Sequence, residues 1–371
     1  MKLGYSLPGT LLVFLLFCFA YVSAQEQPPG VLQKDSAAMK QDGRHPLSFH
    51  GNLDFYYKHI LHGTQAATTS FTSANKRFEL GMLSVQLAYE AKKSGIVLDL
   101  GFGPRARDFA YTDKGAMAAI KQAYVYYDLI KGLRITAGTW ATHIGYELLD
   151  PALNAHYSMS YLFSTGPFSN TGLKSAYTAG NHHMMVGISN PTDYRSVPEN
   201  LFNRKTLIAR YSYEKPGAIT MALNYSGGRQ PDSANLQQLD GVLALPLGSK
   251  LSLGWNGSVV FRKKPKVPST ESAVRSWNNW WGQALYLKAD LSNQLQLALR
   301  EEYFEDKKGL SAIPLLGSVW ATTATMAFRY GDMTILPEIR WDQFSHLYGD
   351  AESANAPGSQ WQALMAVTYQ F

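Results

Sequence analysis

A serine and three histidines are the residues whose types could support covalent catalysis. Ser189 lies in the run 187–191, Gly-Ile-Ser-Asn-Pro, near the end of an expected strand. A lipase-like barrel enzyme needs such a nucleophile, a histidine base and an orienting polar side chain in contact. Ser-Asn-Pro at a strand end is far more often a turn, and no Gly-x-Ser-x-Gly elbow occurs. An enzyme is therefore the weaker interpretation and no catalytic residue is expected, although connections carry His143, His156 and His346.

Adjacent pairs of histidines or acids are the residues closest to a metal site. His182 and His183 are neighbours in an expected strand, as are Glu301 and Glu302. Adjacent strand residues point to opposite faces of a sheet, so neither pair can bind one ion together. The sequence has no His-Glu-x-x-His motif and no phosphate-binding loop. We therefore expect neither a metal ion nor a cofactor.

Opposed charges across a narrow channel offer a third kind of chemistry. Glu147 and Asp150 lie in a long connection, residues 143–170, between two expected strands. If this connection folds into the lumen of a barrel, the carboxylates would face basic wall residues. The resulting transverse field would order water and discriminate solutes. The same carboxylates could instead only pin the connection by salt bridges, and the sequence leaves both options open. The wall candidates are Arg105, Arg210, Arg300 and Arg340.

The connection 143–170 is too long for an idle link in a compact barrel. Its composition is also unusually apolar for a loop, so we do not expect it to extend into water. We expect residues 151–157 to form a short helix and the connection to narrow the pore. Its apolar residues are Tyr146, Leu148, Leu149, Leu153, Tyr157, Met159, Tyr161, Leu162 and Phe163.

Alternation of apolar and polar residues supplies the elements that would position these side chains. Short joins such as 92–94, 130–131 and 180–181 alternate with long ones such as 60–76 and 264–276. This rhythm is typical of an outer-membrane barrel with short periplasmic turns, and an even strand count puts both termini in the periplasm. We expect about sixteen strands, near residues 47–59, 77–91, 95–107, 117–129, 132–142, 171–179, 182–190, 203–214, 218–227, 236–246, 249–263, 277–291, 294–304, 318–330, 333–345 and 360–371.

The first expected strand shows which face meets the membrane. Phe49, Leu53 and Phe55 alternate with polar residues that include Asp54 and Lys58. A cationic side chain on the lipid face costs about 2–4 kcal/mol at mid-bilayer, so the charged face must point inward. A soluble β-sandwich alternates too, and only the other features decide between the two. The second strand breaks phase around residues 82–83, which predicts either a β-bulge there or a strand boundary at another position.

Both ends of the chain are consistent with a bacterial envelope protein. The last expected strand ends on Phe371, as in barrels whose terminal aromatic residue is read by the assembly machinery. Residues 1–24 are expected to be a secretory signal peptide, and residues 25–46 a disordered periplasmic segment. Cys18 is the single cysteine, so the mature chain should have no disulfide.

The long connection also carries a family resemblance. The run 138–147, Gly-Thr-Trp-Ala-Thr-His-Ile-Gly-Tyr-Glu, precedes Asn154, Ser158, Ser160, Pro167 and the pair 171–172, Thr-Gly. This order and spacing resemble the signature of the OmpL-like β-barrel porin family of Gram-negative bacteria. The resemblance implies a passive outer-membrane channel. A looser resemblance to phosphate-selective porins lacks the dense lysine cluster that would support phosphate.

These features together predict an all-β, transmembrane, antiparallel up-and-down β-barrel at residues 47–371, with one long loop folded into the lumen. The expected function is a passive diffusion channel for small hydrophilic solutes and ions. Inward positions carry a small excess of basic side chains, so the channel should be weakly anion-preferring at best. An outer-membrane barrel with an adhesion or recognition role is the alternative from another class.

The expected location is the bacterial outer membrane, and the expected partners follow from it. They are outer-membrane lipid and lipopolysaccharide, the barrel assembly machinery through Phe371, and small solutes, with a homotrimer as one option. The net charge of +6 is spread along the chain, and no basic run is long enough to indicate nucleic-acid binding.

Overall fold

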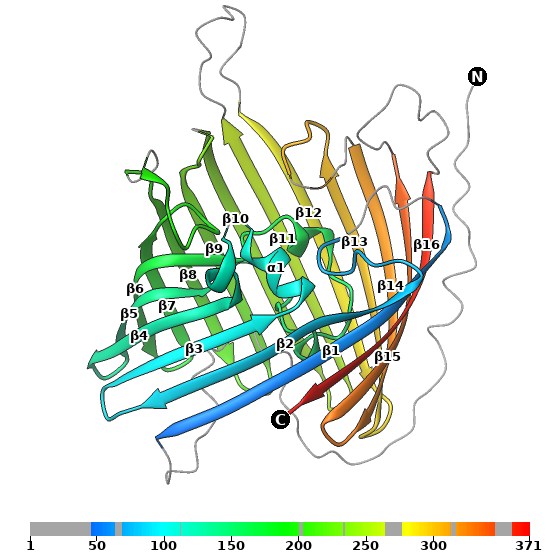
Figure 1. Cartoon of the computed structure of the whole chain (residues 1–371), viewed down its shortest axis with the longest axis horizontal. Helices are drawn as coiled ribbons and strands as arrows, with labels where there is room; N and C mark the ends of the chain where they lie inside the picture. Colours follow the sequence, from blue (N-terminus) through cyan, green and yellow to red (C-terminus); the bar gives the residue numbers. More distant parts are fainter. Residues whose placement is uncertain are drawn as a thin grey trace, which may run out of the picture.

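Sixteen antiparallel strands close into a barrel in the computed structural model (Figure 1). The structure describes residues 46–63, 69–111, 113–199, 203–232, 234–263, 277–311, 313, 317–345 and 358–371. Each strand pairs with its neighbours in sequence, and β1 pairs with β16 to complete the ring. The strands are β1 Leu47–His62, β2 Arg77–Glu90, β3 Ser94–Phe102, β4 Ile120–Ile130, β5 Leu133–Ala141, β6 Ser169–Ala179, β7 His182–Ser189, β8 Thr206–Lys215, β9 Ile219–Arg229, β10 Asn235–Leu247, β11 Leu251–Lys263, β12 Asn278–Asp290, β13 Leu295–Asp306, β14 Gly317–Tyr330, β15 Met333–Phe344 and β16 Ser359–Gln370.

The predicted number and order of strands are confirmed, but the third strand is shorter than expected. It ends at Phe102, and a helix, α1 (Pro104–Ala110), follows in place of the expected continuation to residue 107. Gly103 between them has φ +121°, and Pro104 has no amide hydrogen to give to the sheet. A 3₁₀ turn, η2 (Gly115–Ala119), then leads into β4. Arg105 therefore lies on a helix rather than on a wall strand.

The two faces of the strands differ as the alternation predicts. On β1, Leu53 and Phe55 are 38% and 44% exposed on the outer face, whereas Asp54 and Tyr56 are each 1% exposed inside. The outer face also carries an aromatic band on consecutive strands, as expected near a membrane interface. Its members on β12–β16 are Trp281, Tyr303, Trp320, Trp341 and Trp361.

Glu301 on β13 departs from this apolar outer face. It pairs across the sheet with Leu285 and Thr322, whose strand positions face outward. The Thr322 hydroxyl donates a hydrogen bond of 2.9 Å to its carboxylate. The next residue, Glu302, is fully buried on the opposite face. The adjacent acids thus point apart, as the sequence predicts.

A β-bulge interrupts the pairing of β1 with β2 near the predicted phase break. The register shifts between Asp54 and Phe55, and Gly81 on β2 is left without a partner. A Cβ atom on Gly81 would lie 2.6 Å from the Tyr157 hydroxyl. The predicted bulge is therefore confirmed, and a side chain at this position would meet the interior.

The barrel closes where the two ends of the described chain meet. The amide of Phe371 donates to the carbonyl of Gly51 at 3.0 Å, and the amide of Gly51 donates back at 2.9 Å. The Phe371 ring lies 5.7 Å from the ring of Phe49. In Figure 1 the C-terminus lies at the barrel end that carries the short turns. Within the described residues, neither α-helix has the length and hydrophobicity to cross a bilayer.

Gly138 on β5 should be the least replaceable glycine of the wall. Its φ is +131°, and an added Cβ would lie 2.6 Å from the Cα of Tyr124 on β4. We expect Gly138→Ala to lower the free energy of unfolding by about 3 kcal/mol. The control is Gly180→Ala, in a turn with φ +60° and open space around its Cα, which should cost about 1 kcal/mol. Urea titration in lipid vesicles measures both, and equal losses would contradict the expectation.

Candidate functional site

The connection between β5 and β6, residues 142–168, is called the β5–β6 segment here. It contains a 3₁₀ turn, η3 (Pro151–Leu153), and a short helix, α2 (Tyr161–Ser164). The predicted helix over residues 151–157 is therefore wrong, because only its first three residues form a helical turn. Helix α2 starts later because Ser160 caps it: the Ser160 hydroxyl accepts a hydrogen bond from the Phe163 amide at 3.0 Å.

The β5–β6 segment contacts strands on the far side of the ring. Nε2 of His143 lies 2.8 Å from the Tyr225 carbonyl on β9, and burial lowers the pKa of this histidine to about 4. The Gly145 amide donates to Asp240 on β10 at 3.0 Å. The segment then reaches β13, which is eight strands from β5 in the ring order. Its neutral imidazole at His143 and its backbone thus make polar contacts well beyond the neighbouring strands.

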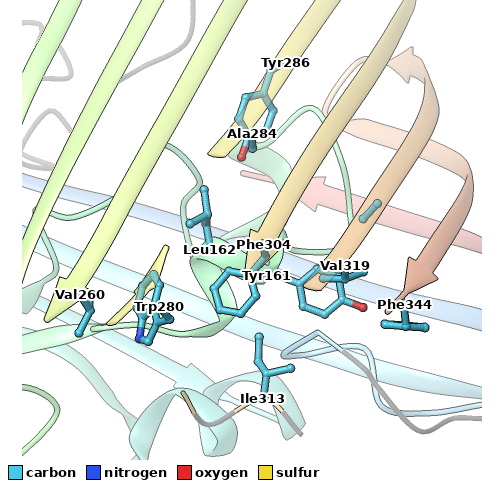
Figure 2. Packing of buried hydrophobic residues seen from close by; sticks show 11 residues of the cluster. Tyr161, Leu162, Val260, Trp280, Ala284, Tyr286, Phe304, Ile313, Val319 and Phe344 are labelled. Atoms are coloured by element: carbon cyan, nitrogen blue, oxygen red, sulfur yellow. The ribbon is translucent and has the colours of Figure 1, made fainter. Parts of the chain in front are cut away.

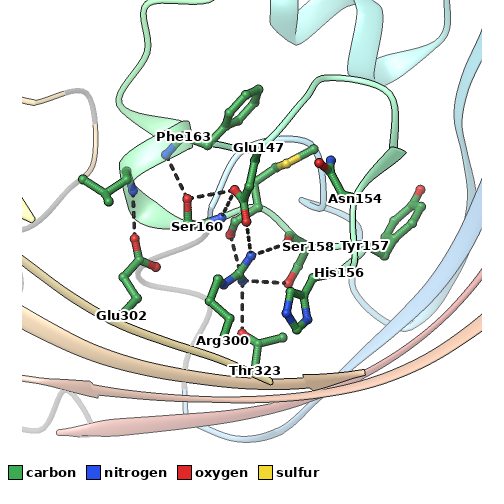
Figure 3. A network of polar contacts seen from close by, with 12 residues as sticks. Glu147, Asn154, His156, Tyr157, Ser158, Ser160, Phe163, Arg300, Glu302 and Thr323 are labelled. Carbon is green, nitrogen blue, oxygen red and sulfur yellow. Dashed lines mark hydrogen bonds and ion pairs between the residues drawn. The ribbon is translucent and has the colours of Figure 1, made fainter. Parts of the chain in front are cut away.

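Glu147 and Arg300 form the buried ion pair of the site (Figure 3). Oε1 of Glu147 lies 2.5 Å from Nη1 of Arg300, which also donates to the Ser158 carbonyl at 2.9 Å. Nη2 of Arg300 donates to the Thr323 hydroxyl at 3.1 Å. The Arg300 side chain is fully buried, so the pair is shielded from solvent. The structure therefore brings together these two residues, both of which were predicted from the sequence.

Asp150 pairs with a lysine that sequence reasoning missed. Nζ of Lys121 lies 2.8 Å from Asp150 and 3.1 Å from Asp99 on β3. The register of β3 with β4 shifts between Asp99 and Leu100, which allows Lys121 to be buried beside an inward-facing Gln122. Simple alternation cannot place two neighbours inside. The only sequence signal is therefore the lysine itself, next to a strand start.

The other three predicted arginines contact the β5–β6 segment without pairing with Glu147 or Asp150. Arg105 on α1 donates to the Leu149 carbonyl at 3.4 Å, and its guanidinium lies 5.0 Å from the centre of the Tyr157 ring. Arg210 donates to the His143 carbonyl at 3.2 Å. Arg340 donates to the Met159 carbonyl at 2.8 Å and pairs with Asp342 at the same distance.

Two wall glutamates bind the backbone of the segment. Glu302 on β13 accepts hydrogen bonds from the amides of Tyr161 and Leu162, each at 2.9 Å. Glu338 on β15 accepts from the amides of residues 157 and 158 at 2.9 and 3.3 Å. Alternation identifies both acids as inward-facing. Their partners were missed because no sequence pattern reveals which backbone amides reach them.

Apolar side chains of the segment pack against the same wall. Tyr161 and Leu162 join a buried cluster that includes Trp280 on β12 and Phe304 on β13 (Figure 2). A second buried cluster is formed by three connections alone, and its members are Phe71, Phe109, Met159, Phe163 and Phe168. The expected apolar character of the connection is thus explained by packing inside the protein.

A buried aspartate links the end of the segment to the β7–β8 connection. The amides of Phe168 and Ser169 each donate to the Asp193 carboxylate at 2.8 Å. Nearby, Arg195 pairs with Asp113 of the β3–β4 connection at 2.8 Å. The pKa of Asp193 is raised to about 6, because the effect of burial exceeds the opposite effects of the Phe168 and Ser169 amides and of Arg195.

This raised pKa predicts a pH dependence of stability. The folded protein holds the Asp193 proton more tightly than the unfolded chain, whose ordinary value is 3.8. The contribution of Asp193 is therefore greatest below that value and is lost as the pH rises through about 6. The free energy of unfolding should be measured for the wild type and for Asp193→Asn. The difference between the two proteins should change as the pH rises from 3.8 to about 6. Parallel curves for the two proteins would contradict the assignment.

Comparison with known proteins gives one family and a set of structures. The family model described as "Putative beta-barrel porin-2, OmpL-like" matches residues 46–371. No curated protein matches the sequence. OmpT of Vibrio cholerae matches with a TM-score of 0.58 and 10% identity, over 88% of this chain and 97% of its own.

Two further structures match over similar lengths. An anion-selective porin from Comamonas acidovorans has a TM-score of 0.57 and 11% identity, over 88% of this chain and 99% of its own. Salmonella typhi OmpF, solved with daunomycin, has a TM-score of 0.55 and 11% identity, over 88% of this chain and 97% of its own. At such identities these structures support the fold alone. The family match confirms the resemblance in the long connection, and the chain belongs to the OmpL-like family of outer-membrane β-barrel porins.

Proposed function

We propose that this porin is a passive diffusion channel for small hydrophilic solutes and ions, narrowed by the β5–β6 segment folded into its lumen. The contacts between this segment and strands β9, β10, β13, β15 and β1 carry the proposal. Both acids predicted at the constriction, Glu147 and Asp150, are held in ion pairs with Arg300 and Lys121. These pairs fit the pinning role best, and the constriction then comes mainly from the bulk of the segment.

The proposed channel needs no catalytic residue, because bore and lining charge alone determine what passes. The short turns and both termini are proposed to face the periplasm, with Phe371 as the contact for the assembly machinery and lipopolysaccharide around the outer rim. A homotrimer is the proposed assembly option. The signal peptide expected at residues 1–24 and most of the tail expected at 25–46 lie outside the described residues.

Single-channel recording of the purified full chain in planar bilayers tests the proposal. We expect discrete steps of conductance, because a ring of sixteen strands encloses room for water beside the segment. The alternative is a barrel filled by its own side chains, with a recognition role at the surface. The complete burial of inward-facing Arg300 and Glu302 favours that alternative. A silent bilayer and no liposome swelling with small sugars would support it.

Ion selectivity should be weak, with at best a slight preference for anions. The inward-facing acids Glu79, Glu90 and Asp240 were missed by the sequence reading, and they offset much of the expected basic excess. The reversal potential in a salt gradient should therefore stay close to zero. A clearly cation-selective potential would contradict the prediction.

A further inference from the structure

The inner faces of β13 and β15 bind the peptide backbone of the β5–β6 segment. Glu338 accepts hydrogen bonds from the consecutive amides of residues 157–158, and Glu302 accepts from those of residues 161–162. Both carboxylates are at most 5% exposed. Each therefore accepts hydrogen bonds from a pair of adjacent peptide N–H groups, and Glu338 also accepts one from the Thr325 hydroxyl at 2.9 Å.

Two arginines of the same wall bind the carbonyl groups between those amides. Arg300 donates to the carbonyl oxygens of Ser158 and Met159 at 2.9 and 3.3 Å. Arg340 donates to the Met159 carbonyl at 2.8 Å. Figure 3 shows Arg300 and Glu302 reaching the segment from neighbouring positions of the wall. The wall thus presents acceptors, donors and acceptors again along residues 157–162, which run from a bend at 157–158 into the first turn of α2.

An apolar site lies next to these charged groups. Leu162 packs in the cluster that contains Trp280 and Phe304, and its methyl group lies close to Gly282, where a Cβ atom would approach it to 3.0 Å. The Tyr161 ring stacks on Phe304 at 6.2 Å and lies 4.8 Å from the Arg340 guanidinium. Figure 2 shows both side chains of the segment between wall residues from several strands. Aromatic and aliphatic side chains both fit here.

We propose that the inner face of β12–β15 is a binding site for short peptides with apolar side chains, and that residues 157–162 occupy it as an internal substitute. A carboxylate that pairs with two adjacent amides, and a guanidinium that pairs with two adjacent carbonyls, match the repeating unit of a peptide. A sugar offers hydroxyl groups without this fixed order of donors and acceptors. The inference rests on the proposed function, because a solute must enter the interior to reach this wall.

The proposal is tested by measuring whether an added peptide blocks the conductance of a variant that lacks residues 148–165. The probe is the hexapeptide Tyr-Ser-Met-Ser-Tyr-Leu, which has the sequence of residues 157–162. We expect it to block the conductance of this variant in a concentration-dependent way. The same peptide methylated on the amide nitrogens of its second tyrosine and its leucine should block at least about tenfold more weakly, since a charge-assisted hydrogen bond is lost at each.

Substitutions on one strand provide matched controls in the same background. Glu302→Gln should weaken the block by a similar factor, because it replaces the acceptor for two amides. Glu301→Gln should leave the block unchanged, because that side chain lies on the outer face. Equal block by the methylated peptide, or equal effects of the two substitutions, would overturn the peptide site.

The two proposals fail in different ways. A deletion variant with unchanged conductance would reject the constriction, whatever the peptide does. A deletion variant with raised conductance and no block by the hexapeptide would reject the peptide site alone. If this deletion variant does not assemble, a variant that lacks only residues 157–162 serves instead, because it also leaves the wall site without its internal occupant. The hexapeptide should block that variant, and Glu302→Gln in the same background should weaken the block, whereas equal block with and without Glu302→Gln would overturn the proposal.

Discussion

Removal of residues 148–165 should raise the single-channel conductance several-fold. These residues carry η3, α2 and the apolar side chains that pack against β12–β15. Without them, the four wall charges Arg300, Glu302, Glu338 and Arg340 would be hydrated by water in the bore instead of bound to backbone groups. The wall itself should persist, because its pairing from β1 to β16 does not involve the deleted residues.

The measurement is a comparison of conductance steps for the full chain and the deletion variant in the same lipid and salt. Slower migration after boiling in a denaturing gel checks that both barrels are folded. A variant that folds but conducts like the full chain would show that the β5–β6 segment does not limit the flow. In that case the limiting section would have to lie elsewhere along the wall.

Replacement of Arg300 by methionine should release the β5–β6 segment without opening the barrel wall. The substitution keeps the apolar stem but leaves the Glu147 carboxylate buried without its cation, and it removes the donor to the carbonyls of residues 158–159. Loss of one partner of a buried pair costs about 3–5 kcal/mol. We expect noisy transitions between low and high conductance, and new protease cleavage within residues 142–168.

A matched substitution separates this effect from a general loss of positive charge. Arg329 on β14 pairs with Asp290 at 3.2 Å, and both side chains are more than a third exposed. Arg329→Met should therefore cost less than about 1 kcal/mol and leave the segment in place. The double variant Glu147→Gln/Arg300→Met should recover part of the stability, because no uncompensated charge remains. Equal noise in Arg300→Met and Arg329→Met would argue against the buried pair as the main anchor.

The wall was predictable from sequence because each strand obeys one local rule. Alternation of side chains identified the inward face of β1, with Asp54 and Lys58, and the outward face with Leu53 and Phe55. That rule failed after Phe102, where Gly103 and Pro104 turn the chain into α1. It failed again at Lys121, which a register shift leaves buried beside an inward-facing neighbour.

The site was predictable only in part because its partners are far apart in sequence. Glu147 and Arg300 are separated by 153 residues. Each could be identified from the sequence as a candidate, because Glu147 lies in a long apolar connection and Arg300 lies on an inward face. Glu302 and Glu338 bind backbone amides, which every residue except proline carries, so no side-chain pattern identified their partners. His346, the third histidine of the lipase alternative, lies outside the described residues.

Pairing of β1 with β16 has a consequence for biogenesis. The first and last strands of the barrel to be synthesised are the ones that must meet, so the sheet keeps two open edges until β16 has been made. The β5–β6 segment touches β13, β14, β15 and β1, which flank this seam or form it. The segment therefore contacts strands on both sides of the seam, and these contacts add to the hydrogen bonds between β1 and β16 that hold the ring closed.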